Sequence, residues 1–259
     1  MIEATVALVF GLLMGSFLNV CIHRWPRGRS VVRPRSHCVR CRKLIAWYDN
    51  VPVLSYLVLR GRCRYCGRAI SPRYPLVEFA VGLLFFYFVA TTGPTVAALK
   101  MCVFTAMLVA LTFSDLEKRI LPDELTLGGA IVGLVFALFV PVPDAIARLF
   151  GLSVQPRLES LVDAAIGALP AFFLWSAGWI YEKVRHREGL GLGDVKLMVM
   201  IGVFLGLHGA LYTLVLGALS GSIVGLLYIK LTHQDASTYE LPFGTFLGIA
   251  GLAVAILGL

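Results

Sequence analysis

The sequence predicts an all-α polytopic membrane protein with about eight transmembrane helices and a small cysteine-containing segment between the first two. Three observations lead to this expectation. Hydrophobic residues make up 58% of the 259 residues and charged residues 15%, with a mean hydropathy of +0.83, which is more apolar than a water-soluble domain requires. The apolar segments are hydrophobic on every side, and several approach the roughly 20 residues that a bilayer requires. Between the first two, basic residues and cysteines interrupt the apolar pattern.

The chain divides at this interruption. We expect a first transmembrane helix at residues 1–22, a cytoplasmic segment at 23–75 and a transmembrane bundle at 76–259. Within these parts, the expected membrane helices lie at residues 6–20, 79–90, 96–113, 125–140, 161–181, 197–207, 210–229 and 243–259.

Basic residues between the first two spans predict the orientation. The positive-inside rule places this stretch in the cytoplasm and the N-terminus outside. Counting spans onward, the cytoplasmic side also receives the basic loops at 114–123, 182–196 and 231–240. A basic patch can also bind nucleic acid, but no nucleic-acid-binding module is visible and the topology already explains the charge. Against Asp49 alone, the stretch holds Arg24, Arg27, Arg29, Arg33, Arg35, Arg40, Arg42, Lys43, Arg60, Arg62, Arg64, Arg68 and Arg73.

Four cysteines in this segment form two Cys-x-x-Cys pairs. Cys38 and Cys41 are separated from Cys63 and Cys66 by 21 intervening residues. Two such turns can close a tetrahedral site of four thiolates, which suits zinc. Disulfides are the alternative, which a reducing cytoplasm disfavours, and His37 could replace one thiol although four already fill the site. A segment this small and rich in arginine needs a staple to fold, so we expect structural Zn²⁺.

Further polar residues surround this segment. Asn19, near the cytoplasmic end of the first span, is expected to hydrogen-bond to another helix. The aromatic stretch at residues 47–57 either lies on the membrane surface or packs on the metal site. Glu78, just inside the second span, either pairs with a nearby arginine or has a functional role. Cys21 and Cys102 lie within spans, where packing is the expected role of a thiol.

Two aspartates reach the cytoplasmic boundary at matching depth. Asp115 ends the third span, and Asp194 follows the turn Gly189-Leu190-Gly191-Leu192-Gly193. A carboxylate at the edge of hydrocarbon is costly, so its default interpretation is functional. The glycines let the backbone bend and let another chain approach closely. Two aspartates at one depth could share a proton and act as general base and general acid.

Other interpretations of these residues stay open. Asp194 could cap the next helix, and the glycine-rich turn could bind a nucleotide, although that fingerprint needs a preceding strand. Lys196 could bind substrate or anchor its helix at the interface, and Asp123 is a natural N-cap for the fourth span. Pro242-Phe243-Gly244 indicates a bent start of the last span rather than a catalytic group. The loop at 141–160, predicted outside, contains nothing typical of chemistry.

Together these motifs resemble the bacterial prepilin peptidases, the bifunctional leader peptidases and N-methyltransferases of type IV pilus and type II secretion systems. The resemblance covers nearly the whole chain, in the family's order. Gly189-Leu190 and Thr245 depart from it, since they stand where Ala-Met and Pro are expected. The matching motifs are Gly15-Ser16-Phe17-Leu18-Asn19-Val20, the cysteine pairs with Trp47-Tyr48-Asp49-Asn50 between them, Arg73-Tyr74-Pro75-Leu76-Val77-Glu78, Asp115 followed by Leu121-Pro122-Asp123, Gly191-Leu192-Gly193-Asp194-Val195-Lys196-Leu197, and Pro242-Phe243-Gly244.

The resemblance implies an intramembrane aspartyl protease of the Gly-x-Gly-Asp type with Asp115 and Asp194 as its catalytic pair. The implied substrate is a prepilin or pseudopilin in the bacterial inner membrane, with a basic leader, a glycine before the cut and usually phenylalanine after it. It also implies methylation of the new N-terminal amine by S-adenosylmethionine. We expect Glu78 and the cysteine segment near methyl transfer, and supporting roles for Gly191, Gly193, Lys196 and Glu78.

Two other classes of protein explain part of the pattern. A transporter or channel would bind a cation through Asp115, Asp194 and Glu78, but it gives no reason for a metal-stapled cytoplasmic segment. A non-enzymatic assembly scaffold would use the cysteine segment as its docking module. The sequence does not determine which aspartate starts ionised or where a methyl donor would bind.

Overall fold

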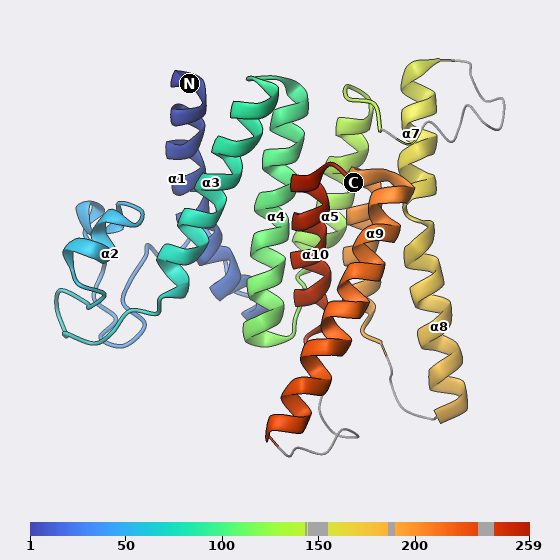
Figure 1. The fold of residues 1–259 in the computed structure, drawn as a ribbon. Coiled ribbons are helices and arrows are strands. Elements are labelled where there is room, and N and C mark those ends of the chain that lie inside the picture. The colour runs from blue at the N-terminus through green and yellow to red at the C-terminus, as the bar shows by residue number, and fades with distance from the viewer. Residues whose placement is uncertain (143, 145–154, 186–189, 233–240) are drawn as a thin grey trace. The chain divides into compact units, whose positions relative to one another are not determined.

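The computed structural model describes residues 1–142, 144, 155–185, 190–232 and 241–259. These residues are almost entirely helical, and among them the only β-structure is two isolated bridges (Figure 1). They form two compact units, Met1–Ala110 and Leu111–Leu259. Helix α4 (Val96–Lys118) begins in the first unit and ends in the second. The aspartate Asp115 therefore belongs to the second unit.

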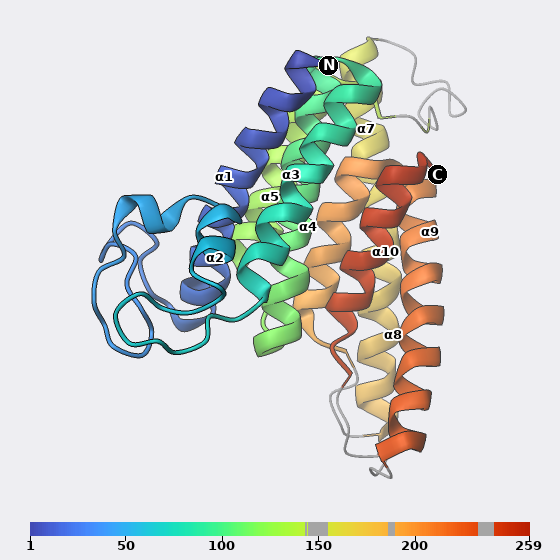
Figure 2. The same cartoon turned by 60° about the vertical axis from the view of Figure 1, so that its left-hand side comes forward.

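The first unit is built on two packed helices, α1 (Ile2–Arg24) and α3 (Arg73–Thr92). They run side by side in Figures 1 and 2. A Cβ at Gly15 would lie 2.6 Å from the Cα of Glu78, so the backbones approach as closely as small residues allow. Asn19 Nδ2 donates to the carbonyl of Tyr74 at 3.0 Å, which confirms the predicted hydrogen bond between helices.

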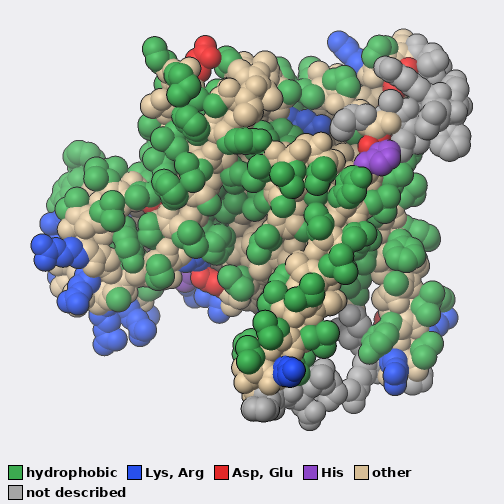
Figure 3. All heavy atoms as spheres, in the orientation of Figure 1, with side chains coloured by type: hydrophobic (Ala, Val, Ile, Leu, Met, Phe, Trp, Pro, Cys, Tyr) green, Lys and Arg blue, Asp and Glu red, His purple; other side chains and the backbone are tan. Residues whose placement is uncertain are grey.

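Between these helices the chain has only short helical turns: η1 (Trp25–Arg27), η2 (Trp47–Asn50) and α2 (Leu54–Val58). None of the described residues in these three elements is fully buried. Lys and Arg side chains gather on the surface around α2 (Figure 3). These three elements therefore bury too little apolar surface to form a hydrophobic core of their own.

The second unit is organised around α9 (Leu192–Thr232), which packs against four helices. In Figure 2, α9 and α10 lie side by side. Gly206, with φ 79°, separates α9 into two helices. Asp144 accepts hydrogen bonds from the backbone N–H groups of Leu207 and His208 and so caps the second one. The neighbours of α9 are α5 (Asp123–Ala137), α7 (Pro156–Gly167), α8 (Leu169–Arg185) and α10 (Phe243–Leu257).

The chain is an all-α polytopic membrane protein. Within the described residues, five helical stretches are long and apolar enough to cross a membrane: α1 with η1, α3, α4, α7 with α8, and α9. Counting the two parts of α9 separately and adding the shorter α5 and α10 gives the predicted eight. The expected helix at 161–181 is in fact two helices, α7 and α8. The two spans expected at 197–207 and 210–229 are joined in one helix, α9, and only the kink at Gly206 separates them.

Candidate active site

Asp115 lies in the last turn of α4, where the chain reverses direction. The backbone N–H of Arg119 donates to the Asp115 carbonyl at 2.7 Å, and Arg119 adopts a left-handed φ of 54°. Ser114 Oγ donates to the Ile120 carbonyl at 2.7 Å. These contacts end the helix at Lys118, three residues after Asp115. The aspartate itself is 5% exposed, so the helix end carries its carboxylate into the interior of the unit.

Asp194 lies in the first turn of α9, and it is only partly buried. Its backbone N–H donates to the Gly191 carbonyl at 3.1 Å, and a Cβ at Gly191 would lie 3.6 Å from Asp194 Oδ2. A negative charge at a helix N-terminus is favourable because the helix dipole is positive there. Of the glycine-rich turn, Gly189 lies outside the described residues.

The two carboxylates converge on Gly244, the second residue of α10. A Cβ at Gly244 would lie 2.9 Å from Asp194 Oδ1 and 3.1 Å from Asp115 Cγ. Those two atoms can therefore be no farther apart than the sum of these distances, and the two carboxylates interact electrostatically. The sequence suggested only a bent helix start at this position. The structure shows that the first turn of α10 is the third wall of the site, and Gly244, the second residue of the predicted membrane helix at 243–259, was its only signal.

Thr245 connects α10 to Asp115 directly. Its backbone N–H and its hydroxyl both donate to Asp115 Oδ2, at 2.6 Å and 2.8 Å. One turn further along α10, Gly248 faces Thr112 of α4. This glycine allows α10 to approach α4 closely enough for these hydrogen bonds to form.

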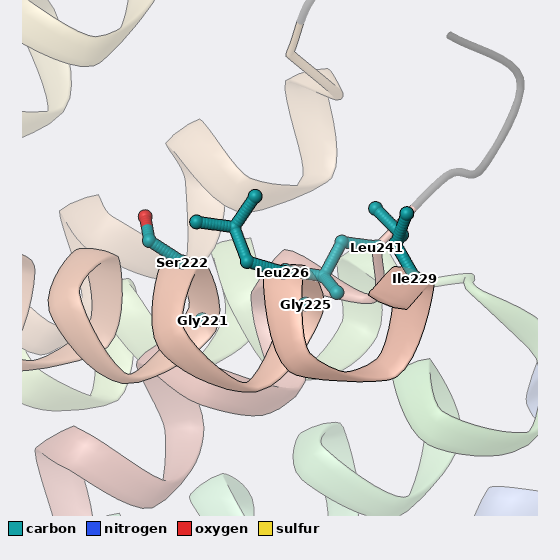
Figure 4. A pocket seen from close by; sticks show the side chains of 6 residues that line it. All are labelled: Gly221, Ser222, Gly225, Leu226, Ile229 and Leu241. Carbon is teal, nitrogen blue, oxygen red and sulfur yellow. The ribbon is translucent and has the colours of Figure 1, made fainter. Parts of the chain in front are cut away.

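Leu241, which lies just before α10, contacts α9. A Cβ at Gly225 of α9 would lie 2.9 Å from Leu241 Cδ1. Leu241 and α9 also line a groove of about 270 Å³ (Figure 4), formed by Gly221, Ser222, Gly225, Leu226, Ile229 and Leu241. None of these six residues is an acid or a base, so the groove does not supply acid–base chemistry.

Lys196 and Leu121 complete the surroundings of the aspartates. Lys196 Nζ lies 2.7 Å and 2.9 Å from the two carboxylate oxygens of Asp123, which ties the start of α9 to the start of α5. The expected N-cap role of Asp123 is wrong: Pro122 occupies that position, and the Asp123 carboxylate binds Lys196 instead. A Cβ at Gly193 would lie 3.3 Å from Leu121, so this glycine admits the leucine side chain.

The arrangement suits acid–base chemistry on a polypeptide. Two close carboxylates do not ionise together easily, so the pair can hold one proton. One member can then accept a proton from water while the other donates one to a carbonyl oxygen. Asp194 is partly exposed whereas Asp115 is buried, so a substrate would meet the pair from the side of Asp194.

The four predicted cysteines form a second chemical centre, in the first unit. Their Sγ atoms all lie within 4.8 Å of one another, and those of Cys38 and Cys66 are 3.9 Å apart. Four thiolates around zinc at about 2.3 Å would stand about 3.8 Å from each other. All six cysteines are free thiols. The group therefore fits a tetrahedral metal ion, whereas Cys21 and Cys102 are buried packing residues, as predicted.

The two cysteine pairs have the same backbone geometry. The N–H of Cys38 donates to the Lys43 carbonyl at 2.9 Å, and the N–H of Cys63 donates to the Arg68 carbonyl at 2.8 Å. Burial raises the pKa of the Cys38 thiol, but hydrogen bonds from the backbone N–H groups of Cys41 and Arg40 outweigh it and lower this pKa to about 7. The thiolate, which is the metal-binding form, is thus favoured at Cys38.

The aromatic stretch between the pairs packs on the second one. Arg64 donates to both carboxylate oxygens of Asp49, at 2.6 Å and 2.7 Å, and its guanidinium lies over the ring of Tyr48. The hydrogen bond with Arg64 lowers the pKa of Asp49. Of the two predicted alternatives, packing near the metal site therefore accounts for this part of the stretch, while Trp47 stays 78% exposed.

Glu78 lies in the first unit, beside the start of α2. Its carboxylate accepts the backbone N–H of Val53 at 2.7 Å and a hydrogen bond from Ser16. Val53 has φ 59°, which is strained for a β-branched residue. The groups that contact the Glu78 carboxylate here are thus neutral donors, and one of them belongs to a strained turn.

Known proteins resemble this chain over most of its length. Residues 9–92 match the family described as "Bacterial Peptidase A24 N-terminal domain", and residues 102–226 match the "Type IV leader peptidase family". A protein of Pseudomonas putida named "Prepilin leader peptidase/N-methyltransferase" is 36% identical, over 98% of this chain and 90% of its own length. The chain belongs to the type IV leader peptidase family.

Other members have the same printed name. One from Myxococcus xanthus is 42% identical over 92% of this chain, which spans 66% of that protein, and one from Pseudomonas aeruginosa is 35% identical over 97% of this chain and 89% of its own length. No solved structure matches. Family membership gives no support to the transporter alternative. The matched ranges include the four cysteines and both aspartates, but α10 with Gly244 and Thr245 lies beyond residue 226.

Proposed function

We propose that this protein is an intramembrane aspartyl endopeptidase that removes the basic leader of type IV prepilins and pseudopilins, with Asp115 and Asp194 as its catalytic pair. The convergence of both carboxylates on Gly244 carries the proposal. Three helices distant in sequence, α4, α9 and α10, bring these groups together. Two carboxylates this close disfavour double ionisation, so a pair that shares one proton is a natural state of this site.

The site supports a mechanism without a covalent intermediate. The ionised aspartate takes a proton from water, and the water oxygen attacks the peptide carbonyl carbon. The protonated aspartate gives its proton to the carbonyl oxygen. When the tetrahedral intermediate collapses, the first aspartate protonates the leaving nitrogen and the second recovers its proton from the hydroxyl group. Both carboxyl groups thus return to their starting states.

The second activity is methylation of the new N-terminal amine, for which S-adenosylmethionine supplies the methyl group. This proposal rests on the names of the relatives. Cys38, Cys41, Cys63 and Cys66 would hold a structural Zn²⁺, as the fit of their four sulfur atoms supports. We place Glu78 and this segment near methyl transfer, while Gly191, Gly193 and Lys196 support the aspartates.

The orientation follows from charge. The positive-inside rule puts the basic cysteine segment at the cytoplasmic face of the inner membrane, with the N-terminus outside. Counting spans onward puts the basic loops at 114–123 and 182–196, which contain Asp115 and Asp194, at the same face. The leader of a prepilin is basic and precedes an apolar helix, so its cleavage site would lie at this same boundary.

The test is cleavage of a prepilin by the full chain in detergent, read by mass spectrometry, with and without S-adenosylmethionine. We expect cleavage after glycine and one added methyl group on the product amine. Asp115→Asn and Asp194→Asn should each reduce cleavage by about 10²–10⁴-fold, the usual contribution of acid–base catalysis. Asp123→Asn is the matched control, since it removes a nearby carboxylate outside the pair. Robust cleavage by either of the first two variants would refute the catalytic assignment.

A further inference from the structure

Thr245 makes an unusual double contact with one oxygen of the aspartate pair. Its N–H and its hydroxyl converge on Asp115 Oδ2 at 2.6 Å and 2.8 Å. The hydroxyl also lies 3.4 Å from the Thr112 carbonyl, so the shorter contact identifies Asp115 as its acceptor. Thr245 and Asp115 are each 5% exposed. Water therefore does not compete for these bonds, which strengthens them.

We propose that Thr245 is a positioning residue that holds Asp115 as the ionised, water-activating member of the pair and leaves Asp194 as the proton donor. This inference rests on the peptidase function proposed above. An N–H group can only donate, and hydrogen bonds to an ionised oxygen are stronger than those to a protonated one. The N-terminus of α10, where Thr245 lies, adds a partial positive charge near Asp115, and the N-terminus of α9 does the same for Asp194. The difference between the two aspartates therefore rests on the two hydrogen bonds from Thr245.

Asp194 has different surroundings. Within the part of the chain that the structure describes, no N–H or hydroxyl group donates to its carboxylate. A charge on Asp115 acts on Asp194 across the gap at Gly244 and disfavours a second negative charge there. The two aspartates are therefore not equivalent, although sequence motifs and depth in the membrane treat them alike.

Other charged groups around Asp115 do not reverse this assignment. Arg119, which follows α4, acts on Asp115 electrostatically and also favours its ionised form. From α9 comes Asp194, and the neighbouring Lys196 is paired with Asp123 of α5. The first turn of α10 contributes only uncharged residues. Replacing Thr245 therefore changes which aspartate is more easily ionised without adding or removing a charged side chain.

The reaction then has fixed starting roles. Asp115 takes the proton from water, whose oxygen forms the new bond to the carbonyl carbon, and Asp194 gives its proton to the carbonyl oxygen. As the carbon–nitrogen bond breaks, Asp115 passes its proton to the leaving amine. Asp194 takes one back from the hydroxyl group.

Three substitutions at Thr245 remove the donors in steps. Thr245→Ser keeps both, Thr245→Val keeps the N–H in a side chain of the same shape, and Thr245→Pro removes both. Proline is tolerated in the first turn of a helix, and the family pattern expects it here. The measurement is kcat/KM for prepilin cleavage against pH in detergent, with the unfolding midpoint of each variant as the control for folding.

We expect the acidic limb of the profile to move to higher pH by about one unit in Thr245→Val and further in Thr245→Pro, because a protonated base is inactive. Thr245→Ser should match the parent protein. Identical pH profiles of kcat/KM in Thr245→Val and Thr245→Ser, at equal unfolding midpoints, would overturn the inference. This comparison can be made even if Thr245→Pro does not fold. Asp115→Asn in the same assay separates the two claims: if it still cleaves, the peptidase proposal itself fails.

Discussion

The aspartate site and the cysteine segment are assembled by opposite means. Asp115, Asp194 and Gly244 come from three helices separated by up to 129 positions in the sequence, and close helix packing brings them together. The four cysteines come from two turns 25 residues apart that have the same local hydrogen bonds. In the first case glycines replace larger side chains at the contacts, and in the second a metal ion held by the four thiols would take the place of a hydrophobic core.

Because the two sites are assembled differently, different changes should disrupt them. A site made by packing fails when volume is added at a contact, even if every catalytic group is intact. A site made by a ligand fails when the ligand is removed, even if every backbone contact could still form. Removing metal and adding volume should therefore affect different parts of the molecule.

Metal removal should have the largest effect, and it should be confined to the cysteine segment. Binding of zinc to small thiolate sites is worth about 10–16 kcal/mol, which is folding free energy for such segments. We expect a chelator, or Cys38→Ser with Cys63→Ser, to expose the arginines of residues 28–72 to trypsin within minutes. Helical content by circular dichroism should stay unchanged, since the helices do not depend on the metal. Cys21→Ser is the control. Equal trypsin resistance with and without metal would contradict the proposal that a metal ion stabilises this segment.

Gly244→Ala should come next, as the sharpest test of packing. The added methyl group would stand 2.9 Å from Asp194 Oδ1 and 3.1 Å from Asp115 Cγ, so at least one carboxylate must move. A misplacement of about 1 Å at a catalytic group can cost 10²-fold in rate, and we expect a loss of that order in prepilin cleavage. Gly128→Ala is the matched control, because a Cβ there meets nothing within 4 Å. Full activity of Gly244→Ala would show that the site does not depend on the close contact between Gly244 and the two carboxylates.

The ion pair between Lys196 and Asp123 should matter less. Its side chains are 34% and 57% exposed, and exposed pairs contribute about 0.2–1 kcal/mol. We expect Lys196→Met to lower cleavage by no more than about fivefold and, in a double-mutant cycle with Asp123→Asn, to show coupling in that range. A loss as large as that of Asp194→Asn would instead place Lys196 in contact with the substrate.

The smallest effect should come from Asp49→Asn in the cysteine segment. Its bond to Arg64 lowers the pKa of Asp49 in the folded state, so the pair stabilises fully above the unfolded pKa of about 3.9 and loses its effect as pH falls below it. The increase in tryptic cleavage caused by Asp49→Asn should therefore be the same at pH 6 and pH 8. An increase that vanishes by pH 6 would exclude this ion pair as the cause.

The sequence alone was informative wherever chemistry and spacing are local. Hydropathy located the eight membrane helices because an apolar span must be continuous, and the two Cys-x-x-Cys motifs predicted a thiolate cluster because a tight turn places both thiols on one side. Asp115 and Asp194 could be singled out because a carboxylate next to an apolar segment is rare. Asn19 was expected to bond to another helix, and it does.

Tertiary structure alone decided how these pieces combine. Pro242-Phe243-Gly244 was expected to be only a bent helix start, because no local rule reveals that a glycine will face two carboxylates from distant helices. Asp123 was expected to cap its own helix, but Lys196 lies within reach only after α5 and α9 pack. The inequality of Asp115 and Asp194 has the same origin. The sequence gives both the same side chain at the same depth, and only packing brings the N-terminus of α10, with Thr245, to one of them.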